Sequence, residues 1–138
     1  MSEQQNVDIV KRGYECFGKG DLDGLIQLMS ENVEWSSPGP ADLPTAGHRQ
    51  GHDQVRQFFG TLNELYVFEQ FDPQQFVAQG DTVVVLGIDR VVVKATGKAV
   101  EAAWAHAFTV RNGTIVRFQE YVDTAAVMTE LRSAQSRT

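Results

Sequence analysis

The spacing of hydrophobic residues changes from helical to strand-like about halfway along this chain. In the first half, Val7, Val10, Tyr14 and Phe17 recur every three or four positions, and this spacing predicts an amphipathic helix over residues 3–18. The same spacing, after Asp21 as a capping residue, predicts a short second helix that ends at about residue 30. It recurs over residues 52–65, where it predicts a third helix with a broad apolar face.

Strand patterns dominate the second half. One or two strands are expected over residues 66–79 with an interruption near Asp72–Pro73, then a turn at Gly80–Asp81 and a long β-branched strand over residues 82–95. Two alternating runs follow, and Thr124 can cap a last helix. An earlier short strand is expected over residues 32–36. The segment 37–47, with three prolines and two glycines, is predicted to be an ordered loop over a pocket mouth.

Helices that precede a hairpin-connected sheet indicate an α+β fold. The 138 residues suit one domain, residues 1–138, and the polar end at residues 133–138 is expected to fray. We expect a strongly bent, mixed or antiparallel sheet wrapped around the three N-terminal helices, with a short C-terminal helix. Such an arrangement leaves a conical cavity between the sheet and the helices.

Residues 98–123 carry the strongest local signal, because Asn112–Gly113 between two alternating runs predicts a two-residue hairpin turn. With Arg111 opposite Thr114, this register places Gln119 opposite His106 and Tyr121 opposite Trp104. The side chains expected on one face, as the wall of a small-molecule pocket, are those of Trp104, His106, Gln119, Tyr121 and Asp123.

His106 and Asp123 would lie about 14 Å apart in a regular hairpin of this register. They would therefore bracket a substrate from two sides, unless a β-bulge brings them closer. The other face of the first strand is nearly all alanine, with Ala99, Ala103, Ala105 and Ala107. An apolar sheet face of this kind predicts a homodimer.

Composition removes several classes of function. The net charge of −6 argues against nucleic-acid binding. The single Cys16 excludes an internal disulfide, and the three histidines lack metal-ligand spacing, so no metal site is predicted. A polar N-terminus without a signal-peptide pattern, and no apolar run of membrane-spanning length, lead us to expect a cytoplasmic protein that does not bind membranes.

Several segments resemble the SnoaL-like branch of the nuclear transport factor 2-like superfamily. The resemblance covers nearly the whole chain, and its residues are Gly18–Asp21, Asn32–Trp35, Gly51–Phe59, Trp104–Phe108, Asn112–Ile115 and Phe118–Thr124. It implies a cone-shaped α+β barrel, commonly a homodimer, with an apolar pocket and neither a metal nor an organic cofactor. It also implies that Asp123, just before the last helix, and His106, on the preceding strand, are the candidate acid/base groups.

The residues leave open whether the protein is an enzyme. In the first hypothesis it isomerises or cyclises a small apolar carbonyl compound: Asp123 removes an α-proton, while His106 and Tyr121 stabilise the oxyanion. In the second hypothesis the pocket binds a hydrophobic ligand, or the domain mediates association, without catalysis. The third hypothesis, epoxide hydrolysis, requires Arg90 inside the cavity, although the alternation of Asp89 and Arg90 along their strand favours Asp89 there.

Structural roles compete with these functions. Asp123 could cap the final helix, and His106 could be a buried histidine hydrogen-bonded by Gln119. The aromatic residues are as consistent with a plain core as with a pocket wall. The residues predicted to contact a bound molecule are Trp104, Gln119, Asp89, Trp35, Tyr14, Phe58 and Phe108.

Overall fold

The computed structural model describes residues 2–136, which form four helices and six strands. The four helices are α1 (Glu3–Gly18), α2 (Leu22–Gln27), α3 (Gly51–Leu65) and α4 (Ala125–Ser136). The strands are β1 (Met29–Ser37), β2 (Gly47–Gln50), β3 (Tyr66–Gln79), β4 (Thr82–Val93), β5 (Lys98–Arg111) and β6 (Thr114–Val122). Residues 133–136 of the expected frayed tail continue α4, and residues 137–138 lie outside the described residues.

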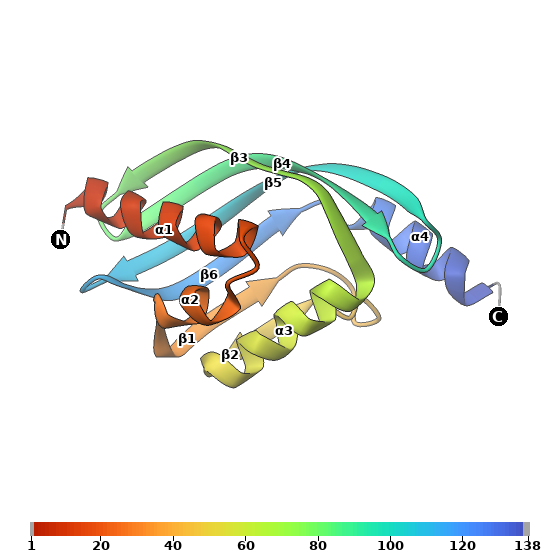
Figure 1. Cartoon of the computed structure of the whole chain (residues 1–138), viewed down its shortest axis with the longest axis horizontal. Coiled ribbons are helices and arrows are strands. Elements are labelled where there is room, and N and C mark those ends of the chain that lie inside the picture. The colour runs from red at the N-terminus through yellow and green to blue at the C-terminus, as the bar shows by residue number, and fades with distance from the viewer. Residues whose placement is uncertain (1, 137–138) are drawn as a thin grey trace.

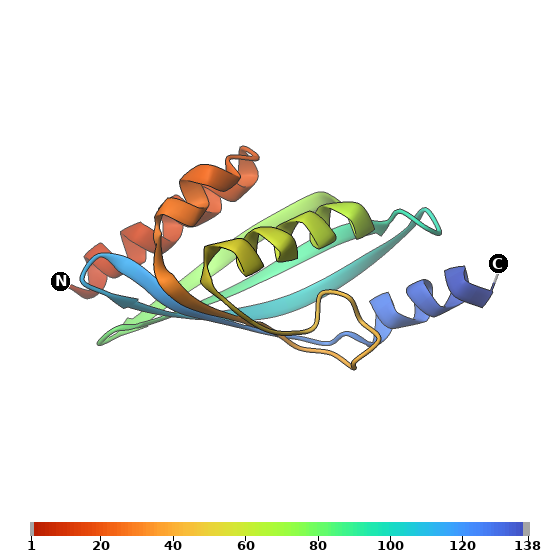
Figure 2. The ribbon, with the colours of Figure 1, turned by 90° about the horizontal axis from the view of Figure 1, so that it is seen from below.

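The strands form one mixed sheet in the order β2-β1-β6-β5-β4-β3 (Figure 1). All neighbours are antiparallel except β1 and β6, which pair in parallel. The sheet is not closed, and Figure 2 shows it as a curved layer with α1, α2 and α3 on its concave side. The predicted α+β cone is therefore confirmed. The short β2 was not predicted as a strand, because its four residues do not alternate and none is buried.

Local sequence explains where the first helices begin. Ser2 and Gln5 form a capping box at the start of α1, in which each side chain bonds the other residue's backbone N–H. Asp21 accepts the backbone N–H of Gly24 at 2.9 Å and so caps α2, as expected from the sequence. The apolar faces of these helices pack against the sheet in a core that includes Val10, Val33 and Val85.

A β-bulge in β6 changes the predicted hairpin register. The turn is as predicted, since Arg111 pairs with Thr114 and Asn112 has a φ of 52°. Further along, Val110 pairs with Ile115 but Thr109 pairs with Arg117, so Val116 is an extra residue in β6. Every later residue of β6 consequently changes face.

The predicted positions of Gln119 and Tyr121 are therefore wrong. Glu120, and not Gln119, lies opposite His106, while Tyr121 pairs with Ala105 on the outer face and is 60% exposed. The sequence held a signal of this bulge: the unbulged register pairs Arg117 with Phe108, which would bury an unpaired charge in the core. In the structure Phe118 pairs with Phe108 instead.

A two-residue turn at Thr96–Gly97, which the sequence suggests, would pair Asp89 with Trp104 and Gly87 with His106, but Val93 pairs with Lys98 and the turn is longer. Asp89 consequently lies opposite Ala102, not Trp104, and Gly87 lies opposite Trp104, not His106. The shift is two residues, an even number, so each side chain stays on its predicted face. Asp89 is on the inner face and Arg90 on the outer face, as the alternation indicated. Within residues 2–136, no helix is long and apolar enough to cross a membrane.

Candidate functional site

A cavity of about 150 Å³ lies between the concave face of the sheet and helices α1 and α3. Most of its wall is apolar, and on the sheet side β4, β5 and β6 contribute Asp89, His106 and Glu120. Its other end is bordered by the loop that carries Leu43 and by the start of α4. An apolar hollow with a few convergent polar groups is the usual form of a small-molecule site.

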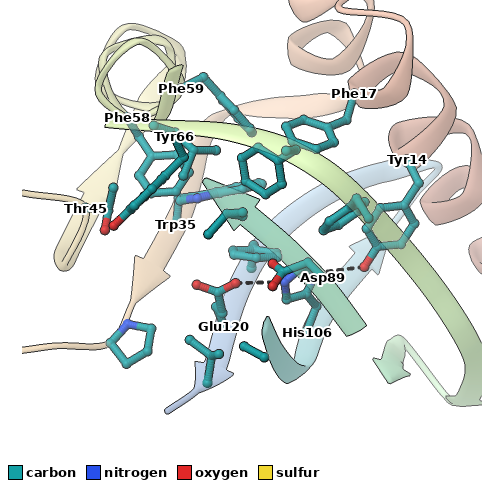
Figure 3. Close-up of a pocket in the computed structure, with 18 of the residues that line it drawn as sticks. Tyr14, Phe17, Trp35, Thr45, Phe58, Phe59, Tyr66, Asp89, His106 and Glu120 are labelled. Carbon is teal, nitrogen blue, oxygen red and sulfur yellow. Dashed lines mark hydrogen bonds and ion pairs between the residues drawn. The ribbon is translucent and has the colours of Figure 1, made fainter. Parts of the chain in front are cut away.

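A hydrogen-bonded chain runs from α1 across the sheet into this cavity (Figure 3). The Oη of Tyr14 lies 2.8 Å from Nδ1 of His106, and Nε2 of His106 lies 3.0 Å from Oε2 of Glu120. Tyr14 reaches His106 because α1 packs on the concave face of the sheet, and the two rings lie nearly parallel, with an interplanar angle of 20° and centroids 6.0 Å apart. Both nitrogens of the imidazole therefore have partners within the protein.

The protonation of this chain follows from its burial. Burial lowers the pKa of His106 despite the nearby Glu120 carboxylate, so the ring is neutral at neutral pH. Burial, together with the charge of Glu120, raises the pKa of Tyr14, so its phenol keeps its proton and donates it to Nδ1. The partners then assign the imidazole proton to Nε2, which donates to Glu120. His106 thus holds Glu120 in place.

Asp89 is the group in the cavity whose proton affinity is matched to neutral pH. Its side chain is half-buried on the inner face of β4, and in Figure 3 it lies beside His106 and Glu120. Burial, and then the negative charge of Glu120, raise the pKa of Asp89 to about 7. Near pH 7 this carboxyl can accept or release a proton at little cost, which is the property of a general acid or base.

Trp35 lines the cavity, whereas Trp104 is packed in the sheet-side core next to it. Trp35 is stacked on Phe118 at a centroid distance of 3.9 Å, and its buried Nε1 has no hydrogen-bond partner within residues 2–136. Trp104 is packed between Phe71 and His106, at centroid distances of 5.0 and 3.9 Å, and its indole stacks on the imidazole. Of the other residues predicted to contact a bound molecule, those that line the cavity are Asp89, Tyr14, Phe58 and Phe108.

A sequence profile of the SnoaL-like domain matches residues 10–118. The chain belongs to the SnoaL-like domain family. An uncharacterised protein of Mycobacterium tuberculosis is 29% identical over 127 residues, which cover 91% of this chain and 95% of that protein. The resemblance seen in the sequence is therefore confirmed over most of the chain.

Solved structures agree with this assignment. A nuclear transport factor 2-like protein from Burkholderia xenovorans is 36% identical, with a TM-score of 0.85 over 94% of this chain and 97% of its own. TerC, crystallised with polyporic acid, is 26% identical, with a TM-score of 0.82 over 91% of this chain and 96% of its own. Both proteins therefore share this fold over most of the chain.

Asp123, the acid/base candidate that the family resemblance indicated, lies at the mouth of the cavity and is exposed. Its Oδ1 accepts the backbone N–H of Ala125 at 2.9 Å, so the carboxylate holds the first turn of α4. This is the helix-capping role that competed with catalysis in the sequence. His106 and Asp123 border one cavity, while Tyr121 and Gln119 lie on the outer face of the sheet and do not line it.

Arg90 lies on the outer face, where it forms ion pairs with Glu69 at 2.9 Å and Glu101 at 2.8 Å. The epoxide hydrolase hypothesis required this guanidinium inside the cavity, so the position of Arg90 removes that hypothesis. Residues 2–136 contain no group of three His, Cys, Asp or Glu side chains that could hold a metal ion.

Proposed function

We propose that this SnoaL-like protein catalyses a proton transfer on a small, mostly apolar carbonyl compound, as an isomerase or aldol-type cyclase that needs no cofactor. The observation that carries the proposal is the Asp89 carboxyl, half-buried in an apolar cavity beside Glu120 and with its pKa raised to about 7. A carboxyl of this kind is a poor structural element, because its ionisation in the folded protein is costly. It is well suited to proton transfer.

In the proposed reaction, the Asp89 carboxylate takes a proton from the carbon next to the carbonyl group. The electron pair of the broken C–H bond moves to the carbonyl oxygen and gives an enolate. In an isomerase, Asp89 returns the proton to another carbon. In a cyclase, the enolate carbon attacks a second carbonyl group of the same molecule, and the alkoxide that forms takes the proton back from Asp89. The buried N–H of Trp35 lines the same cavity and can donate to a carbonyl oxygen.

Glu120 influences the protonation of Asp89, and the Tyr14–His106 pair fixes the position of Glu120. The charge of Glu120 favours the protonated form of Asp89, and the hydrogen bond from His106 fixes where that charge lies. His106 and Tyr14 are therefore positioning residues here, because both imidazole nitrogens bond to protein groups. This assignment moves the base from Asp123, the candidate from the family resemblance, to Asp89.

Exchange of α-protons for deuterium tests the proposal without knowledge of the natural substrate. We expect the protein to accelerate exchange into single-ring ketones in D₂O, measured by proton NMR. Asp123→Asn should keep the rate within about threefold, since Asp123 is exposed and caps a helix. A large loss in Asp123→Asn would return the role of the base to Asp123. Saturable ligand binding without exchange would support the non-catalytic alternative.

We also propose that the outer face of the sheet forms a homodimer. Ala105 lies at its centre, paired with Leu86 on one side and Tyr121 on the other, and these two side chains are 41% and 60% exposed. Small residues between exposed apolar side chains make a flat surface that a second copy can cover.

Ala105→Arg is expected to turn the dimer into a monomer, because it would bury two like charges close to the symmetry axis. Sedimentation velocity at micromolar concentrations measures this. Gln57→Arg, an equal change at an exposed position of α3 on the helix side, is the control and should leave the dimer intact. A wild-type protein that sediments as a monomer would contradict the proposal.

A further inference from the structure

A second hollow lies on the far side of the aromatic wall that bounds the cavity. It is a groove of about 810 Å³ between α1–α2 and α3, with β3 along its length. Six aromatic side chains line both hollows, namely Tyr14, Phe17, Phe59, Tyr66, Phe68 and Phe71. The cavity and the groove are therefore separated by a wall that is one layer of side chains thick.

Phe17 is the centre of this wall. Its ring centroid lies 5.1 Å from that of Phe71, 5.4 Å from that of Phe68 and 6.0 Å from that of Phe59. All four rings are only half-buried, because the groove leaves one side of each uncovered. In Figure 3, Phe17 and Phe59 lie above the cavity, on the side away from Glu120. Phe17 borders both hollows, so a different staggered rotamer of its side chain would join them.

The two volumes decide what the cavity can hold. An apolar cavity of about 150 Å³ accommodates one benzene-sized molecule, whereas ligand pockets commonly measure about 300–1,000 Å³. The cavity beside Asp89 has about 150 Å³, and the groove has about 810 Å³. Only the reacting end of a larger substrate fits beside Asp89, and the groove has room for the remainder.

The charged residues at the groove already have partners. Arg56 forms an ion pair with Asp23 at 2.7 Å, Glu69 pairs with Arg90 at 2.9 Å, and Nζ of Lys94 donates to the backbone oxygen of Asn63 at 2.5 Å. The two ion pairs neutralise Arg56 and Glu69, Lys94 keeps its charge at the exposed rim, and the aromatic wall offers apolar surface. The groove therefore suits an uncharged hydrocarbon chain better than an anionic one.

We propose that the substrate is an elongated molecule, with a single-ring carbonyl head in the cavity and an apolar chain in the groove. This inference rests on the proposed function for the position of the head, and it adds the substrate class. The groove becomes a binding site for the chain, and Phe17 separates the site of the head from the site of the chain.

A series of 4-alkylphenols, from phenol to 4-octylphenol, tests the inference by calorimetry, because phenol resembles the enol of a single-ring ketone. Each methylene group buried in the groove should strengthen binding about three- to fourfold, over at least the first four carbons. Phenol itself should bind weakly through the cavity alone.

Gly60→Trp should block the groove only. Gly60 lines the groove and not the cavity, and a Cβ at this position meets no atom within 4 Å, so the indole can occupy the groove without moving the backbone. We expect phenol to bind within twofold of wild type and 4-octylphenol to bind at least 50-fold more weakly. Gln57→Trp, on the exposed face of the same helix, is the matched control and should keep the gain with chain length.

The possible outcomes separate this inference from the proposed function. If phenol binds but affinity does not grow with chain length, the groove is not used, and the proposed function stands. Two results with Gly60→Trp would also overturn the division into head and chain. One is an affinity that still rises with alkyl length as in wild type, and the other is a loss of phenol binding although the variant melts like wild type. If no member of the series binds, both the groove and the cavity proposals fail.

Discussion

Asp89→Asn is expected to lower the rate of α-proton exchange about 1,000-fold, within the range that a positioned general base contributes. The amide keeps the shape of the carboxyl but cannot accept the proton. Because the pKa of Asp89 is raised to about 7, the wild-type rate should rise with pH, reach half its maximum near pH 7 and then level off. The residual rate of the variant should lack this step. Asp89→Asn with a rate within threefold of wild type would exclude Asp89 as the base.

The same substitution has a second readout in stability. Between about pH 4 and pH 7 the folded protein holds a proton on Asp89 that the unfolded chain, with an ordinary pKa of 3.8, has released. The free energy of unfolding of the wild type therefore falls as pH rises through this window, and stays lower above it. The amide in Asp89→Asn does not titrate, so the stability of the variant relative to wild type should increase from pH 4 to pH 8 in urea denaturation. A difference that is constant with pH would contradict the raised pKa.

Gly87→Ala is expected to destabilise the fold by about 3 kcal/mol, at the upper end of the usual cost of overpacking. A Cβ at Gly87 would overlap Cζ2 of Trp104, and would lie 2.6 Å from its Cη2 and 2.7 Å from the backbone oxygen of Asp72. The indole cannot retreat, because it is stacked between Phe71 and His106. For a domain of this size the change corresponds to a melting temperature lower by about 10 °C.

The stacked rings connect this position to the site. An indole pushed away from Gly87 presses on His106 and moves the hydrogen bond that holds Glu120, so the variant should also lose exchange activity. Gly60→Ala is the control, because its Cβ meets no atom within 4 Å and alanine favours a helix; it should stabilise by about 0.5–1 kcal/mol. A melting temperature of Gly87→Ala equal to that of wild type would mean that Trp104 can move freely.

The α+β class, the order of most elements, the Asn112–Gly113 turn and the inward face of β5 could all be predicted from local sequence patterns. These features depend on residues close together in the chain, where hydrophobic spacing and turn chemistry act. The sequence also placed Asp89 inside and Arg90 outside, because an error of two residues in the turn leaves the alternation of faces intact. The homodimer and the role of Asp89 stay predictions until the experiments above are done.

The β6 residue that lies opposite His106 could not be predicted in this way, because it depends on the packing of the folded chain. One extra residue, Val116, moved Glu120 into the cavity and Tyr121 out of it. The bulge buries Phe118 against Phe108 and keeps Arg117 at the surface, a gain that depends on the core as a whole. The contact of Tyr14 with His106 joins residues 92 positions apart, and the raised pKa of Asp89 arises from burial and from Glu120 on another strand. Such effects depend on distances in space, which local sequence patterns do not contain.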